Sequence, residues 1–395
     1  MDRPPASEAG DTGSIPVGST IDKTVKSFNN TLFMAESFQQ RVLDHLGLDI
    51  DELSKEVLKP DQHRIAEMFH GTTEQSSLSS ASKVLKIVER ATRGNRFLGV
   101  RAAATFAHAF YQEKGGEPAD TDFLHDAHSG VQQMTRDILQ GMMLPESGIV
   151  PGDSIDHFQQ AMELNRQGES VMFEIVPHSS ELDPVFIDTI MRELQNSRDA
   201  SVARDAGEFL EKSLMIIGHK VMLSRLRRTF AGTVRALSTI APKYRVNLKP
   251  ETEAPLIGTH SAAVGKIAAA ARKHAEYVLL LCPEGGRTKN GQIGMYRVSG
   301  MGGGYRVPLM LNMPDNYLGL DSTNPESLLP ANVQLYVGKP HIPDTRRYVE
   351  STRESLQTVF APVNRFQWGY KSPDRDAPNI DRVRGAPEIF EPISS

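Results

Sequence analysis

The residues best suited to chemistry stand in the stretch Pro177–Pro184, where His178 and Asp183 are five positions apart. An apolar run, Val171–Val176, precedes this stretch and a helix-like pattern, Val185–Met191, follows it. The pair is therefore expected where a buried strand passes into a helix. Across such a turn, a carboxylate can hold one imidazole nitrogen while the other accepts a proton from a hydroxyl. The two side chains are a candidate general base.

The same two residues also have a simpler interpretation. Asp183 stands directly before Pro184, which is typical of a helix N-cap followed by a first-turn proline. His178 is then an ordinary loop histidine. A histidine and a carboxylate at this spacing are a weak pattern, so the pair alone does not decide between the two interpretations.

A second stretch of this kind lies about a hundred residues on, in Leu279–Lys289. An apolar strand pattern again ends in a turn, which contains the glycine pair Gly285 and Gly286. Arg287 and Lys289 follow, and in an extended segment side chains two positions apart point the same way. Glycines let a backbone approach a ligand closely, and two cations can hold a phosphate.

Together, the two stretches resemble the motifs of a known family, the glycerolipid acyltransferases. His178 and Asp183 match its histidine-four-residues-aspartate motif, and Pro283–Arg287 resembles its phosphate-binding motif. Within the family, the chain is most similar to the soluble glycerol-3-phosphate 1-O-acyltransferases of the plastid and chlamydial type. The double glycine with two cations, a preceding helical region and the lack of an apolar membrane span carry this resemblance, which is closest from Phe158 to Asn312.

The resemblance implies a role for particular residues. His178 and Asp183 take the catalytic positions, Arg287 and Lys289 the phosphate-binding ones, and Lys243 that of a further phosphate-binding lysine. There are also departures from the pattern. Tyr244 stands where the family has a basic residue or a histidine, Glu284 replaces a serine of the plant enzymes, and Lys289 replaces their arginine.

The implied reaction is acyl transfer to the sn-1 hydroxyl of glycerol 3-phosphate, the first step of phospholipid synthesis. His178 would take the hydroxyl proton as the oxygen attacks an acyl thioester of acyl carrier protein or CoA, with no covalent enzyme intermediate. Backbone amides near Gly285 and Gly286 would stabilise the oxyanion. No metal or other cofactor is implied. The alternatives are another acceptor (lysophosphatidate or dihydroxyacetone phosphate), a thioester or ester hydrolase, and a binding protein without turnover.

A block of cations between residues 220 and 249 contains no acidic residue, although the whole chain has a net charge of -5. Its members are Lys220, Arg225, Arg227, Arg228, Arg235, Lys243, Arg245 and Lys249. Such a block is either a solvated surface or a docking site for an anionic ligand, for which the acidic acyl carrier protein is a candidate. The net negative charge and the scarcity of interleaved aromatic residues argue against nucleic acid.

Composition and hydropathy describe an ordinary soluble chain of 395 residues, with 39% hydrophobic and 24% charged residues. The single cysteine, Cys282, excludes an internal disulfide and is expected to be a small core residue in a reducing compartment, with a reactive thiol as the alternative. No apolar run reaches the length of a membrane span. We expect a cytoplasmic protein, or a stromal one after removal of a transit peptide, with contact to membranes at most peripheral.

Hydrophobic periodicity divides the chain into three parts. Residues 1–20 have the composition of a disordered tail, and residues 21–145 indicate a helical-bundle domain with a helix over residues 79–90. The Pro- and Gly-rich run Met143–Asp153 marks the boundary. In residues 146–395, strand patterns alternate with helical ones, which predicts an α/β acyltransferase domain with a largely parallel or mixed sheet flanked by helices.

Overall fold

The computed structural model describes residues 38–49, 53, 84–89, 96–112, 123–176, 178, 180, 182–218, 221–222, 225–239, 254–283, 303–312 and 332–343. The strands are β1 (Leu124–His125), β2 (Gly148–Ile149), β3 (Val171–Ile175), β4 (Ser213–Gly218), β5 (Ala236–Thr239), β6 (Val278–Leu281), β7 (Tyr305–Asn312) and β8 (Gln334–Val337). The helices are α2 (Phe38–His45), α6 (Arg96–Gln112), α7 (Ser129–Met142), α8 (Asp153–Arg166), α9 (Asp183–Leu194), α10 (Ala200–Lys212), α12 (Arg225–Ala231) and α13 (Ala254–Lys273).

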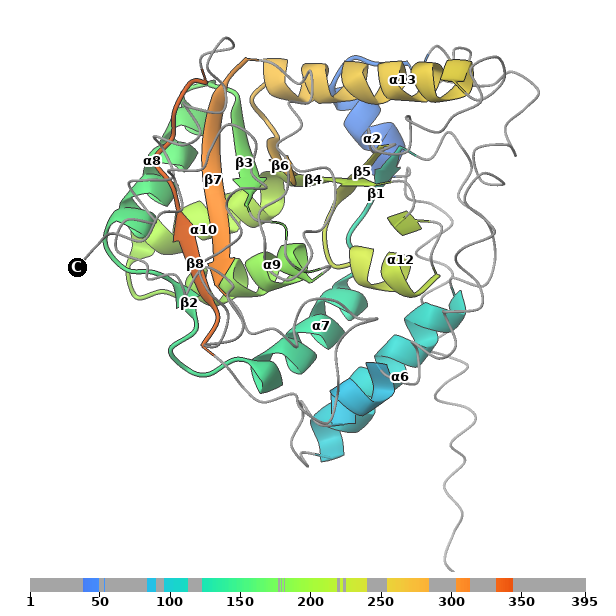
Figure 1. Ribbon diagram of the computed structural model, residues 1–395, viewed down its shortest axis with the longest axis vertical. Coiled ribbons are helices and arrows are strands. Elements are labelled where there is room, and N and C mark those ends of the chain that lie inside the picture. Colours follow the sequence, from blue (N-terminus) through green and yellow to red (C-terminus); the bar gives the residue numbers. More distant parts are fainter. Residues whose placement is uncertain are drawn as a thin grey trace, which may run out of the picture.

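The strands form one 8-stranded mixed sheet in the order β1-β5-β4-β6-β3-β7-β8-β2 (Figure 1). Its centre is parallel, since β5, β4, β6, β3 and β7 all run in the same direction. The antiparallel pairs lie outside this centre, at β1 with β5 and at β7 with β8. Because β3 and β6 are parallel neighbours, the segments that follow them emerge at the same edge of the sheet.

Helices cover both faces of the sheet, and the strands alternate accordingly. In β3, Val171, Phe173 and Ile175 belong to a core shared with α7, α8, α9, α10 and α12, whereas Met172 packs in a second core with α2 and α13. Figure 1 shows α13 and α2 on one side of the strands and α7, α9 and α12 on the other. Because both faces of the sheet are covered, most side chains of its strands are buried on one face or the other. This explains why the strand sequences are almost continuously apolar.

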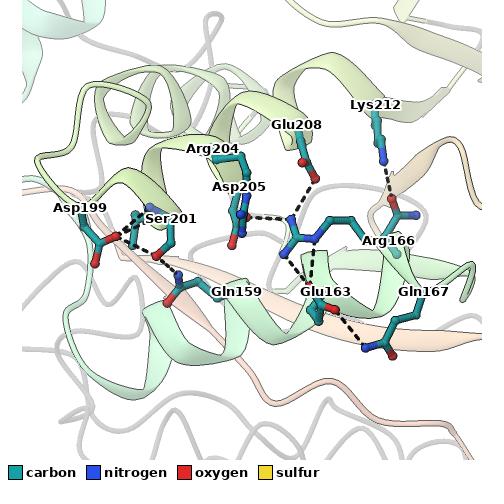
Figure 2. Close-up of polar contacts among 12 residues, drawn as sticks. Gln159, Glu163, Arg166, Gln167, Asp199, Ser201, Arg204, Asp205, Glu208 and Lys212 are labelled. Atoms are coloured by element: carbon teal, nitrogen blue, oxygen red, sulfur yellow. Dashed lines mark hydrogen bonds and ion pairs between the residues drawn. The ribbon is translucent and has the colours of Figure 1, made fainter.

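A polar network joins α8 to α10 on the first of these faces (Figure 2). The Arg166 guanidinium donates to Asp205 at 2.8 Å, to Glu208 at 3.0 Å and to Glu163 at 3.0 Å. The Asp205 side chain is 1% exposed, so its negative charge depends on these donors. Arg204, whose side chain is 57% exposed, adds a second contact to Asp205 from the solvent side.

The predicted fold class is confirmed as an α/β fold with a mixed sheet flanked by helices. Gly168 follows the end of α8, and its positive φ of 87° suits a glycine after a helix. Much of the predicted helical-bundle domain lies outside the described residues. Of its described part, β1 pairs with β5, and α7 contributes to the core under the sheet. The division into two domains stays a prediction.

Candidate active site

His178 lies in the segment that connects β3 to α9. The Val176 N–H still bonds to the Leu309 carbonyl of β7 at 2.7 Å, so the strand pairing reaches almost to this segment. Asp183 is the first residue of α9, and Pro184 follows it at a position where a missing N–H costs no helical hydrogen bond. A sheet strand and a buried helix N-terminus therefore fix the two ends of the segment that carries His178.

The two predicted side chains meet. His178 Nδ1 and Asp183 Oδ2 are 2.9 Å apart, with 16% of the histidine side chain and 0% of the aspartate side chain exposed. Because Nδ1 contacts the carboxylate, a proton exchanged with a substrate would pass through Nε2. This is the arrangement that orients an imidazole for proton transfer.

Backbone groups hold the Asp183 carboxylate in turn. The Ser180 N–H lies 3.2 Å from Oδ1 and 3.1 Å from Oδ2 of Asp183, while the Ser180 hydroxyl accepts from the Leu182 N–H at 3.0 Å. The N-cap residue of α9 is Leu182, which makes no side-chain capping bond. The carboxylate of Asp183 thus points back to the segment before the helix, and not along the helix as an N-cap would.

Cys282 is the neighbour that the sequence did not place at this site. It directly follows β6, and Glu174 of β3 lies opposite Leu281 of β6, so Ile175 and Cys282 come next on the two strands. Its side chain is half-buried and packs against the core on the α9 face. Interaction with the Cys282 side chain is one of the causes that raise the pKa of His178. A cysteine ending one strand pattern and a histidine just beyond another could have suggested this meeting, but only once the two strands were known to be neighbours.

Charge around His178 sets its protonation. Burial lowers the pKa of His178, but the electrostatic and hydrogen-bonding influence of Cys282 and Asp183 outweighs this effect. The pKa of His178 therefore lies well above its ordinary value.

An apolar pocket begins beside the pair. Leu182 and Val185, which flank Asp183 and Pro184, form part of its wall together with Val84, Ile87, Thr135, Ile138, Leu139, Met142 and Phe230. The pocket is narrow, with a cavity volume of about 20 Å³, close to the space that one water molecule needs. Its lining comes from residues 84–89, α7, α12 and the start of α9. Such a lining suits a hydrocarbon chain.

The predicted phosphate-binding residues Arg287, Lys289 and Lys243 lie outside the described residues, as do Gly285 and Gly286. Three side chains of the cation block are described, and they differ in setting. Arg227 and Arg228 are half-buried on α12, the helix that also supplies Phe230 to the pocket. Arg235 Nε lies 3.5 Å from Asp126, and its guanidinium lies over the Phe38 ring. Arg235 thus has contacts that hold the fold.

Within the described ranges, no group of three or more His, Cys, Asp or Glu side chains is arranged to hold a metal ion. Among the helices that the structure describes, none has the length and apolarity to cross a membrane. In comparisons with known proteins, no family model matches the chain and no curated protein matches it.

Proposed function

We propose that this protein is a glycerolipid acyltransferase that moves an acyl group from a thioester to the sn-1 hydroxyl of glycerol 3-phosphate. The observation that carries the proposal is the His178–Asp183 contact of 2.9 Å between β3 and α9. It joins the two residues through which the sequence resembles the glycerol-3-phosphate 1-O-acyltransferases. The product would be 1-acylglycerol 3-phosphate, made in the first step of phospholipid synthesis.

The proposed chemistry assigns one task to each group. Asp183 holds the imidazole, and the far nitrogen of His178 takes the proton of the acceptor hydroxyl while the oxygen attacks the thioester carbonyl. The amides near Gly285 and Gly286 receive the developing negative charge of the carbonyl oxygen. Arg287, Lys289 and Lys243 hold the phosphate, so that the hydroxyl stays within reach of His178. The carrier thiol leaves with a proton.

The donor would approach from the α12 side. Phe230 of α12 lines the apolar pocket, and Arg225, Arg227 and Arg228 belong to the same short helix. An acyl chain in the pocket would therefore bring an anionic carrier, acyl carrier protein or CoA, close to these cations. Residues 84–89 and α7 close the pocket from the region predicted as a helical bundle. We propose that this region serves to hold the acyl chain.

The product of this reaction is a lipid, and the cellular location that we propose follows from this. The enzyme would work in the cytoplasm, or in the plastid stroma after removal of a transit peptide, with peripheral contact to the membrane that receives its product. An exposed apolar surface would favour such contact, and Phe97 and Val100, one turn apart on α6, are 73% and 69% exposed.

The test is an acylation assay with radiolabelled glycerol 3-phosphate and two donors, palmitoyl-acyl carrier protein and palmitoyl-CoA. Labelled 1-palmitoylglycerol 3-phosphate is the expected product, and a donor Michaelis constant that rises with salt would identify the anionic carrier that docks. Lysophosphatidate and dihydroxyacetone phosphate are run in parallel as acceptors. Preference for either of them would change the acceptor assignment, and release of free palmitate without any acylated acceptor would make the protein a thioester hydrolase.

A further inference from the structure

The outward face of α6 carries apolar side chains. Phe97 and Val100 are one turn apart on this helix, and they are 73% and 69% exposed. Ala104 continues the exposed stripe, because residues three or four apart lie on one face of a helix. The opposite face carries Ala102 and Phe106, which are buried in the core. The helix is therefore apolar on its outer side as well as on its inner side.

The exposed ring of Phe97 has a fixed neighbour. Arg101 lies one turn further along α6, and its guanidinium carbon is 5.8 Å from the centre of the Phe97 ring. The same guanidinium makes two hydrogen bonds to Asp137 of α7, of which the one from Nε measures 2.7 Å. The Asp137 side chain is 2% exposed. Because a two-pronged contact to a buried carboxylate fixes the guanidinium, the outward position of Phe97 belongs to a packed pair of helices.

The segment of residues 84–89 is also apolar on two sides. Val84 and Ile87 line the apolar pocket and are 1% and 4% exposed. Leu85 and Lys86 stand between them in the same helical turn and are exposed, Leu85 to 43%. The wall of the pocket is here one helix thick, which is about 10 Å. Leu85 thus lies on the outer side of a wall whose inner side would hold the acyl chain.

The sequence that contains these two segments is basic. Residues 83–101 include a single acidic residue, Glu89, and six cations, which are Lys83, Lys86, Arg90, Arg93, Arg96 and Arg101. The whole chain has a net charge of -5, so the charge of this stretch is opposite to that of the molecule. A cluster of about four to eight cations on or beside an amphipathic helix is typical of a segment that binds anionic lipid.

We propose that the face formed by Leu85, Phe97 and Val100 binds the surface of an anionic bilayer. This inference rests on the proposed function and deepens it, since it names the partner that receives the lipid product. A bilayer takes up single projecting apolar side chains, while its anionic headgroups attract the cations beside them. The core of an interface between folded proteins is instead broad, closely packed and depleted in lysine. A narrow apolar stripe in a basic segment fits the bilayer.

The place of α6 in the molecule gives the product a short way out. Figure 1 shows α6 beyond α7 and α12, on the side of these helices away from the sheet, and it packs against both of them. The two helices supply Ile138 and Phe230 to the lining of the apolar pocket. A bilayer on α6 and Leu85 would therefore lie next to the wall of the pocket. The acyl chain of the product would pass from one apolar environment to another.

The test is cosedimentation of the full chain with two kinds of vesicle, one of phosphatidylcholine alone and one of equal parts phosphatidylcholine and phosphatidylglycerol. We expect binding to the anionic vesicles to be at least about tenfold tighter than to the neutral ones, and to weaken as salt is added. The double variant Phe97→Ser with Val100→Ser removes apolar area without changing the charge, and should bind anionic vesicles at least about tenfold more weakly. Lys86→Glu changes the charge instead, and should weaken this binding about fivefold or more.

Ile342→Ser is the matched control. Ile342 follows β8 and is 64% exposed, so it is an apolar side chain of similar exposure in another part of the fold. This variant should bind anionic vesicles as native protein does. Circular dichroism checks that every variant is folded, which we expect because substitutions of exposed side chains change stability little.

Two results would overturn the inference. One is native protein that does not bind anionic vesicles, or that binds them no better than the double serine variant does. The other is a native dimer in sedimentation equilibrium that the double serine variant loses, because a second copy of the chain would then cover this face.

Acylation measured without vesicles separates this inference from the proposed function. The double serine variant should acylate glycerol 3-phosphate at the native rate, and a large loss would assign Phe97 and Val100 to the reaction and not to the membrane. Vesicle binding without acyl transfer would support the lipid-binding face and overturn the proposed reaction. Acyl transfer without vesicle binding would support the reaction and overturn the lipid-binding face.

Discussion

At the scale of single residues, Asp183 determines how His178 can act. Its carboxylate has no solvent exposure and takes the Ser180 N–H and the His178 imidazole as partners. A carboxylate at the first position of a helix also lies in the favourable field of the helix N-terminus. Its negative charge is thus supported locally, and the carboxylate can keep the imidazole in one orientation through a cycle of proton transfer.

The first prediction concerns the titration of His178. Burial lowers the pKa of His178, and interactions with Cys282 and Asp183 raise it by more, so Cys282→Ser, which replaces the acidic thiol by a hydroxyl, should lower the pKa of His178. A raised folded-state pKa stabilises the fold fully below the unfolded value of about 6.5, and the contribution is lost as pH rises through the folded-state pKa. The measurement is the imidazole NMR titration, with the signal assigned by its absence in His178→Gln. An identical pKa of His178 in Cys282→Ser and in native protein would show that Cys282 does not influence the titration of His178.

The second prediction concerns the cations predicted to hold phosphate. A guanidinium offers two parallel hydrogen bonds and an ammonium does not, so Arg287→Ala should impair glycerol 3-phosphate acylation more than Lys289→Ala. A lost charge-assisted contact is worth about 1.5 to 3 kcal/mol, or roughly ten- to a hundredfold in specificity constant. Plain glycerol, which lacks the phosphate, is the control acceptor and should be affected little. Equal losses on both acceptors would assign these cations to the donor or to the fold.

At the scale of elements, the contact between α8 and α10 tests how buried charge holds the fold. The third prediction is that Arg166→Ala costs about 1.5 to 3 kcal/mol in the free energy of unfolding, because the buried Asp205 loses its inner partner. Arg204→Ala, the matched control on the exposed side of Asp205, should cost less than about 1 kcal/mol. Urea unfolding measures both. Similar losses in the free energy of unfolding would contradict the prediction, because the exposed arginine would then stabilise the fold as much as the inner one.

Substitutions in the pocket between α7 and α9 can test whether the acyl chain lies there. As the fourth prediction, Ile138→Phe should shorten the pocket and lower the specificity constant for palmitoyl donors relative to octanoyl donors. Excluding two methylenes from an apolar site costs about 1.6 kcal/mol, or roughly tenfold. Met134→Phe is the control, since Met134 is equally buried on α7 but outside the pocket lining. A chain-length preference changed equally by both variants would place the acyl chain elsewhere.

The elements themselves were largely predictable. The strand at Val171–Ile175 and the helix from Asp183 follow from a continuous apolar run and a helical pattern that begins at a proline. The contact between His178 and Asp183 was predictable too, because both residues belong to one turn. Local periodicity and short spacing carry information of this kind.

At the scale of the whole molecule, the alternation of strands and helices was enough to predict an α/β sheet, but not the order of its strands. Cys282 shows the difference. It is about a hundred residues from His178 along the chain, and it lies beside the end of β3 because β6 is placed between β4 and β3. The pairing of distant strands depends on tertiary packing, which no local pattern records. The position of Cys282 beside β3 could therefore be known only from the strand pairing in the structure.

The fifth prediction tests the central claim most directly. It is the rate of glycerol 3-phosphate acylation in native protein and in His178→Ala, measured with saturating donor, while circular dichroism checks that both are folded. Loss of the group that transfers protons should lower turnover by about two to four orders of magnitude with the fold unchanged. Near-native turnover in folded His178→Ala would contradict the assignment of this imidazole to the reaction.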